Sequence, residues 1–134
     1  MNLKNEIRME GLTLTVADVK HSSDYYGALG FSLEWDASPA FAMLRMGGPN
    51  GTTLGLLAHA EAAKEGTKKI GDLEARGIHV ELSTDNLDGL YEELIGRGVT
   101  IDVPPHDEPW ERSMTALDPD GYSVEFSEGR RGKS

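Results

Sequence analysis

The 134-residue sequence predicts an α+β fold made of two tandem βαβββ modules, with curled mixed sheets around a cleft and the helices packed outside. The first observation is a repeat. The same order of patterns returns with an offset of 68 residues, so that Gly30 and Gly98 follow equivalent helical stripes. The second is that each stripe follows one alternating stretch and precedes three more. The third is a proline–glycine turn before the last strand of each half, at residues 48–51 and 118–121.

The first strand of each half is expected at residues 11–16 and 79–83. Apolar residues there alternate with Gly, Thr, Ser, Glu or His, which is typical of a strand whose two faces have different surroundings. A helix follows each strand. Its first turn is capped by Asp18 in the first half and by Asp85 or Asn86 in the second, because their side-chain oxygens accept the free backbone N–H groups.

Glycines end both helices and separate them from the remaining strands. Gly30 and Gly98 are expected at position C′, where a left-handed backbone is needed. Three strands then follow in each half, and in chain order they are expected at residues 31–35, 41–46, 52–57, 99–103, 112–117 and 122–127.

The whole chain is expected to form one domain, because its length suits a single hydrophobic core. The first module covers about residues 9–58 and the second about 78–128. Residues 59–77 form a charged linker that is expected to be partly helical, and residues 129–134 form a flexible tail.

Composition excludes several classes of function. The chain has no cysteine, which rules out disulfides, thiolate metal sites and a cysteine nucleophile, and fits a cytoplasmic location. Its net charge of −10 disfavours nucleic acid as a partner and favours a cationic ligand, although the same charge also serves solubility alone. No apolar stretch is long enough to span a membrane, and the N-terminus lacks the apolar core of a signal peptide.

Three segments together resemble the vicinal-oxygen-chelate superfamily, which includes glyoxalase I, bleomycin-resistance proteins and extradiol dioxygenases. They are LTLTVADV and the helix-closing LGF in the first half, and LDPDGYSVEF at the end of the second. The resemblance covers residues 11 to 128 and is specific for the fold. It does not specify the reaction, because the superfamily contains lyases, dioxygenases, thiol transferases, epimerases and drug-binding proteins.

The resemblance implies four metal-ligand positions, at the first and last strands of each half. In this sequence they fall on Gly11, Gly55, His79 and Glu125. Glycine offers no side-chain ligand, and a catalytic divalent ion usually needs about three protein ligands. We therefore expect either no cofactor or a divalent metal ion held by His79 and Glu125 alone.

These four residues have alternative interpretations. His79 and Glu125 could be two ligands of a metal site, a metal-free acid–base pair, or a hydrogen-bonded pair without chemistry. Gly11 and Gly55 could mark a bulge or a close backbone approach, or they could enlarge the cleft where ligands would otherwise converge.

A ligand-binding surface is expected from aromatic and polar side chains at comparable points of the two halves. Core or interface packing would explain the aromatic residues equally well. Arg112 and Arg45 could reach an anionic group, but a lone arginine on a strand is more often part of a surface ion pair. His21, His59 and His106 are interpreted as surface residues. The expected ligand-binding residues are Trp35, Phe41, Met43, Trp110 and Arg112.

Three functions follow from this reasoning. The first is a protein that binds a small organic molecule without a complete metal site. The second is a divalent-metal-dependent lyase or dioxygenase that uses His79 and Glu125. The third is a domain that mainly dimerises or binds another protein. The resemblance implies a homodimer in which each cleft joins the first half of one chain to the second half of the other.

Overall fold

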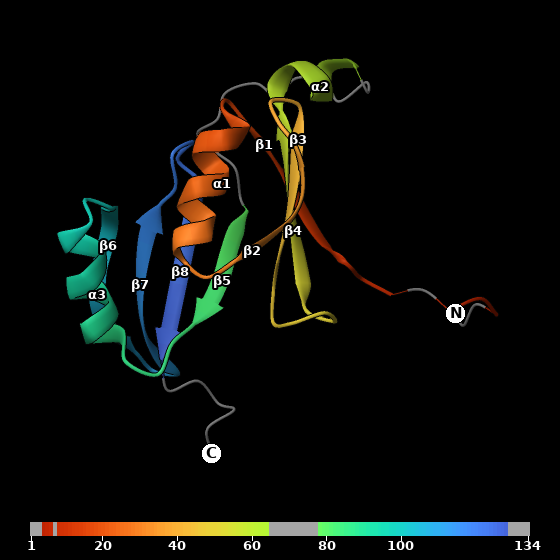
Figure 1. Ribbon diagram of the computed structural model, residues 1–134. Coiled ribbons are helices and arrows are strands. Elements are labelled where there is room, and N and C mark those ends of the chain that lie inside the picture. The colour runs from red at the N-terminus through yellow and green to blue at the C-terminus, as the bar shows by residue number, and fades with distance from the viewer. Residues whose placement is uncertain (1–3, 7, 65–77, 129–134) are drawn as a thin grey trace. The chain divides into compact units, whose positions relative to one another are not determined.

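The computed structural model describes residues 4–6, 8–64 and 78–128 (Figure 1). The chain divides into two compact units, Met1–Gly71 and Asp72–Ser134. Residues 59–64, the described part of the expected linker, are helical. The rest of the linker and the expected tail lie outside the described residues.

The first unit contains one mixed sheet, with strand order β1-β4-β3-β2. Strand β1 pairs parallel to β4, and the other two pairs are antiparallel. The elements are β1 (Gly11–Val16), α1 (Val19–Ala28), β2 (Ser32–Ala37), β3 (Phe41–Met46), β4 (Thr52–Ala58) and α2 (His59–Lys64).

The second unit repeats this arrangement, with strand order β5-β8-β7-β6 and a parallel β5–β8 pair. Its elements are β5 (His79–Ser83), α3 (Leu87–Gly96), β6 (Thr100–Glu108), β7 (Glu111–Leu117) and β8 (Ser123–Glu128). The predicted α+β class with two tandem βαβββ modules is confirmed.

Both helices begin and end as the sequence predicts. The Oδ1 atom of Asp18 accepts a hydrogen bond from the backbone N–H of His21 at 3.0 Å. In the second half the cap is Asn86 rather than Asp85, because Asn86 Oδ1 accepts from the N–H of Gly89 at 3.0 Å. The backbone φ angles of 115° at Gly30 and 79° at Gly98 are left-handed, as C′ requires.

Strand β6 is longer than predicted. It was expected at residues 99–103, and the next two residues, Pro104 and Pro105, lack the backbone N–H groups that donate to a sheet. The structure continues β6 to Glu108 and shifts its register between Val103 and His106. β6 is an edge strand, where prolines are tolerated.

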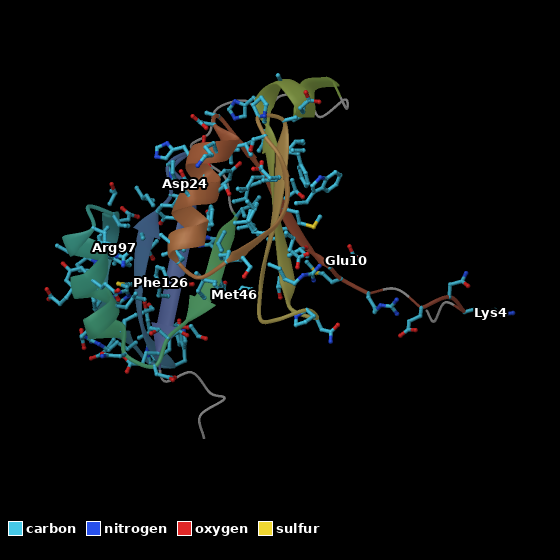
Figure 2. All side chains as sticks on the ribbon, viewed as in Figure 1. Lys4, Glu10, Asp24, Met46, Arg97 and Phe126 are labelled. Carbon is cyan, nitrogen blue, oxygen red and sulfur yellow. The ribbon has the colours of Figure 1, made fainter. Side chains whose placement is uncertain are left out.

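Each sheet has one face packed against its helix, here called the helix-covered face, and an opposite face, here called the open face. Helix α1 packs on β2, β3 and β4, and α3 packs on β6, β7 and β8 (Figure 1). The helix-covered faces hold most of the apolar core, including Phe126 of β8 (Figure 2). The buried strand residues on these faces are Leu14, Val16, Ala42, Leu44, Leu54, Leu56, Val80, Met114, Ala116, Val124 and Phe126.

Candidate functional site

The open face of the first sheet carries three large side chains that lie together. Trp35 of β2 is directly opposite Met43 of β3, and Met43 is directly opposite Gly55 of β4. The rings of Trp35 and Phe41 meet edge to face, with centroids 6.1 Å apart and planes at 74°. Trp35 remains 61% exposed. We call Trp35, Phe41 and Met43 the aromatic wall.

Gly55 of β4 lies next to two residues of the aromatic wall, because Met43 is its register partner and the Phe41 ring is beside it. A Cβ atom on residue 55 would lie 2.6 Å from Oγ1 of Thr13 and 3.2 Å from Cε1 of Phe41. The first distance is shorter than real Cβ contacts, and the second requires the Phe41 ring to move. The space for a metal-ligating side chain at this position is therefore occupied by Thr13 and Phe41.

Gly11 is closed for a different reason. A Cβ atom on residue 11 would collide with the carbonyl oxygen and the hydroxyl group of Thr53, the residue that pairs with Gly11 in β4. Of the two interpretations, the geometry at Gly11 is that of a close backbone approach. A side chain at residue 11 is blocked by backbone atoms, whereas one at residue 55 would require the Thr13 and Phe41 side chains to move.

The open face of the second sheet carries His79 and Glu125. His79 of β5 is opposite Ser123 of β8, and Glu81 is opposite Glu125. Because opposite residues in paired strands share a face, His79, Glu81 and Glu125 lie on one face, with about 8 Å between the Cα atoms of His79 and Glu125. Within the described residues no hydrogen bond joins this pair, and no group of three His, Asp or Glu side chains could hold a metal ion.

Arg112 does not lie with His79 and Glu125. It is on the helix-covered face of β7, where its Nη2 donates to Oδ1 of Asp88 at 2.9 Å and its Nη1 to Oδ1 of Asp107 at 3.0 Å. These two carboxylates raise the pKa of Arg112. The side chain thus links β7 to the start of α3 and to β6. Arg112 is therefore part of a surface ion pair, which was the alternative to its expected role in ligand binding.

Trp110 lies in the turn between β6 and β7 and is 68% exposed. Trp110 therefore belongs to the second unit, whereas the aromatic wall belongs entirely to the first unit.

Two histidines differ in part from their sequence interpretation: His106 is at the surface but lies in a strand, and His59 is half-buried. His106 lies in β6 opposite Ser113, and so on the same open face as Glu125. Its Nδ1 is 3.1 Å from the carbonyl oxygen of Pro104, and its Nε2 is 2.8 Å from Oε2 of Glu108. The Pro104 carbonyl, and then the Glu108 carboxylate, raise the pKa of His106.

His59 is half-buried at the start of α2, and its Nε2 has no hydrogen-bond partner within the described residues.

The signal for His106 was present in the sequence. The spacing His-x-Glu places two side chains on one face of a strand, so residues 106 and 108 can bond each other once β6 includes both. The pair was missed because the strand was expected to end at residue 103, before either side chain.

The first unit also contains a cavity of about 470 Å³ that the sequence did not indicate. It lies beside the β3–β4 turn and is lined in part by Glu34 and Arg45. The Nε of Arg45 donates to Oε2 of Glu34 at 2.7 Å, and its Nη1 donates to the carbonyl oxygen of Gly51 at 2.9 Å. Arg45 holds the pKa of Glu34 below its ordinary value through this hydrogen bond.

Comparison with known families settles the relationship of the chain. A family model described as the Glyoxalase/Bleomycin resistance protein/Dioxygenase superfamily matches residues 8–126. The chain belongs to this family. The resemblance inferred from the sequence motifs is thereby confirmed.

Solved structures of similar fold cover nearly the whole chain. A glyoxalase/bleomycin resistance protein/dioxygenase from Nocardioides has 25% identity and a TM-score of 0.77, with 97% of this chain and 88% of that one covered. A lactoylglutathione lyase from Agrobacterium tumefaciens has 20% identity and a TM-score of 0.69, with 95% and 96% covered. A superfamily member from Sphaerobacter thermophilus has 25% identity and a TM-score of 0.69, with 91% and 98% covered.

The search of curated proteins produced no match to this chain. Among the described residues, no helix has the length and apolar character needed to cross a membrane.

Proposed function

We propose that the protein binds a small organic molecule on the open face of its first sheet, against the aromatic wall. The observation that carries this proposal is the closed position at Gly55. Where the family resemblance implies a metal ligand, the chain places the Phe41 ring and the Thr13 hydroxyl. The first half therefore offers an apolar aromatic surface in place of metal ligands.

Exposure of the wall supports the same proposal. Trp35 is a large aromatic side chain that leaves most of its surface uncovered while its ring is held by Phe41. Ligand sites are mostly lined by apolar and aromatic side chains with a few polar groups nearby. Aromatic side chains have only two side-chain dihedrals, so they also lose little conformational entropy when a planar molecule stacks on them.

Binding is tested with a neutral aromatic probe, 2-(4-nitrophenyl)ethanol, whose nitroaromatic ring quenches tryptophan emission. Trp110→Phe leaves Trp35 as the single tryptophan. We expect saturable quenching in this variant and a matching binding isotherm by calorimetry. Trp35→Ala should lose the calorimetric signal.

Leu33→Ala provides the matched control. Leu33 is also on β2 and is 50% exposed, but its register partner is Leu44, so it lies on the other face. This variant should bind the probe as the wild-type protein does. Unchanged binding in Trp35→Ala, or equal loss in both variants, would contradict the proposal.

A second candidate function is a divalent-metal-dependent lyase or dioxygenase. The observation in its favour is that His79 and Glu125, the two retained family ligand types, share the open face of the second sheet with Glu81. Assays for glyoxalase-type lyase and extradiol dioxygenase activity, after incubation with nickel, zinc, iron or manganese, test it. Activity that His79→Ala abolishes would place this function ahead of simple binding.

We also propose that the protein acts in the cytoplasm as a homodimer. The absence of cysteine supports the compartment, and the family resemblance supports the dimer. Light scattering during size-exclusion chromatography should give about twice the chain mass of 14.6 kDa. A mass equal to one chain would contradict the dimer.

A further inference from the structure

We propose that the ligand of the aromatic wall is a small aromatic carboxylate, and that Arg45 binds its carboxylate group at the end of the wall. This inference rests on the proposed function, because it names the ligand class for the same sheet face. It is carried by the position of Arg45, by the cavity beside it, and by the hydrogen-bonding groups that line that cavity.

Arg45 is placed next to the aromatic wall by the strand geometry. It alternates with Met43 along β3, so both side chains are on the open face and about 7 Å apart. Ser32 is opposite Arg45, just as Trp35 is opposite Met43. A ring stacked at Trp35 and Met43 therefore brings a carboxylate one or two carbon atoms away within reach of Arg45.

The cavity at this end of the sheet has the size of a small-molecule site. Its volume of about 470 Å³ falls within the usual range of about 300–1,000 Å³ for ligand pockets. The lining residues on which the inference depends are Ser32, Glu34, Arg45, Gly47, Gly48 and Pro49.

Arg45 retains hydrogen-bonding capacity after its contacts within the protein. A guanidinium group has five N–H donors. One of them, at Nε, reaches Glu34, and one, at Nη1, reaches Gly51. Within the described residues the other N–H groups of Arg45 donate no hydrogen bond. The side chain is only 24% exposed, so its position is fixed by these two contacts before any ligand arrives.

The cavity lining also includes other hydrogen-bond donors beside Arg45. Gly47 and Gly48 have left-handed φ angles of 101° and 82°, and within the described residues their backbone N–H groups donate no hydrogen bond. Ser32 adds a hydroxyl group. The one charged acceptor, Glu34, already uses Oε2 on Arg45. A guanidinium fixed in place, with further donors at Gly47, Gly48 and Ser32 in the same lining, suits a carboxylate.

Glu34 reaches this position through a bulge in β2. Leu33 pairs with Leu44 and Trp35 with Met43, so Glu34 is one extra residue between two consecutive pairs. A bulge of this kind redirects a side chain, and here the carboxylate meets Arg45 from the neighbouring strand. Glu34 therefore both fixes Arg45 and competes with a ligand carboxylate for it.

The inference departs from the cationic ligand that the net charge of −10 suggested. Long-range charges are screened over about 8–10 Å in physiological salt. A guanidinium in direct contact with a carboxylate acts at hydrogen-bonding distance, where screening is much weaker. The local donors of the cavity, rather than the total charge, then determine which ligand is preferred.

The experiment compares three compounds that share one ring: the anion of 4-nitrophenylacetic acid, neutral 2-(4-nitrophenyl)ethanol and cationic 2-(4-nitrophenyl)ethylammonium. Dissociation constants are measured by calorimetry on the full chain. We expect the anion to bind about tenfold more tightly than the alcohol, as one charged hydrogen-bonded contact allows. Arg45→Gln should abolish this difference in affinity between the anion and the alcohol. Glu34→Gln should tighten binding of the anion.

Arg97→Gln is the matched control, since Arg97 is an exposed arginine that pairs with Glu93 on α3. It should leave the preference for the anion intact. Equal affinities for the three compounds, or tighter binding of the ammonium compound, would overturn the carboxylate inference while the proposed function stands. If none of the three binds, the proposed function itself is wrong.

Discussion

The Phe41 ring of β3 packs beside the backbone of Gly55 on the neighbouring strand β4, where residue 55 has no side chain. The ring atom Cε1 lies 3.2 Å from the point that a Cβ on residue 55 would occupy, and Thr13 Oγ1 lies 2.6 Å from the same point. A position that the family resemblance assigns to a metal ligand is thus filled from the neighbouring strands. Phe41, a residue of the aromatic wall, therefore lies where the side chain of a metal ligand at residue 55 would begin.

A side chain introduced at residue 55 should therefore destabilise the protein. We expect Gly55→Glu to lower the free energy of unfolding by about 1–3 kcal/mol, because Phe41 and Thr13 must leave their present positions. Urea denaturation gives the value. Gly27→Ala is the matched control: a Cβ there meets nothing within 4 Å, and alanine in helix α1 should raise stability by about 0.5–1 kcal/mol. A Gly55→Glu variant as stable as the wild type would show that the position is open.

Asp118 should be the key side chain of the turn between β7 and β8. Its Oδ1 accepts hydrogen bonds from the backbone N–H groups of Asp120 and Tyr122 at 2.8 and 2.9 Å, and the residue is 5% exposed. Asp118→Ala should lower the free energy of unfolding by about 1–3 kcal/mol, because the buried N–H of Tyr122 loses its acceptor. Asp118→Asn keeps an amide oxygen there and should lose less. Equal urea midpoints for the two variants would count against this explanation.

The stability of the β6–β7 hairpin should depend on pH through His106. Its two ring nitrogens both face acceptors, at Pro104 and Glu108, so only the doubly protonated ring donates to both. The pKa of His106 is raised above its ordinary 6.5, chiefly by the Pro104 carbonyl and then by Glu108, against opposing effects of desolvation and, more weakly, of Arg112. The protonated form is therefore favoured by folding. Its stabilising effect is complete below about pH 6.5 and is lost as the pH rises through the folded-state pKa.

The measurement is the melting temperature of the wild type and of His106→Asn between pH 5.5 and 8.5. The gap between the two proteins should be largest at the acid end and should shrink toward the alkaline end. His21→Asn, at an exposed position in α1, should follow the wild type throughout. A gap that is constant with pH would mean that His106 does not titrate as a donor to Glu108.

The sequence predicted the fold more completely than the site, and the reason lies in the range of the interactions. Alternation, the caps and the glycines at residues 30 and 98 are local signals, and they placed nearly every element. The closure of Gly55 depends on Phe41 in the next strand, which no local pattern records. The same holds for Arg112, whose face follows from strand register and whose partner Asp88 is on a helix. His106 was missed because its strand continues past two prolines.

Metal binding is the remaining test of the second sheet. His79 and Glu125 share a face, but within the described residues they do not belong to a group of three metal-ligating side chains. Two protein ligands leave most of the coordination of a divalent ion to water, so binding should be weak and easily reversed. We therefore expect protein purified without chelators or an affinity tag to contain far less than one nickel, zinc, iron or manganese ion per chain after dialysis.

His21→Ala, at an exposed helical position, is the control for adventitious binding by histidine. Near-stoichiometric metal that is lost in His79→Ala and in Glu125→Gln, but retained in His21→Ala, would contradict this expectation, because it would require further ligands beside these two. The lyase and dioxygenase assays would then take precedence over the binding measurements.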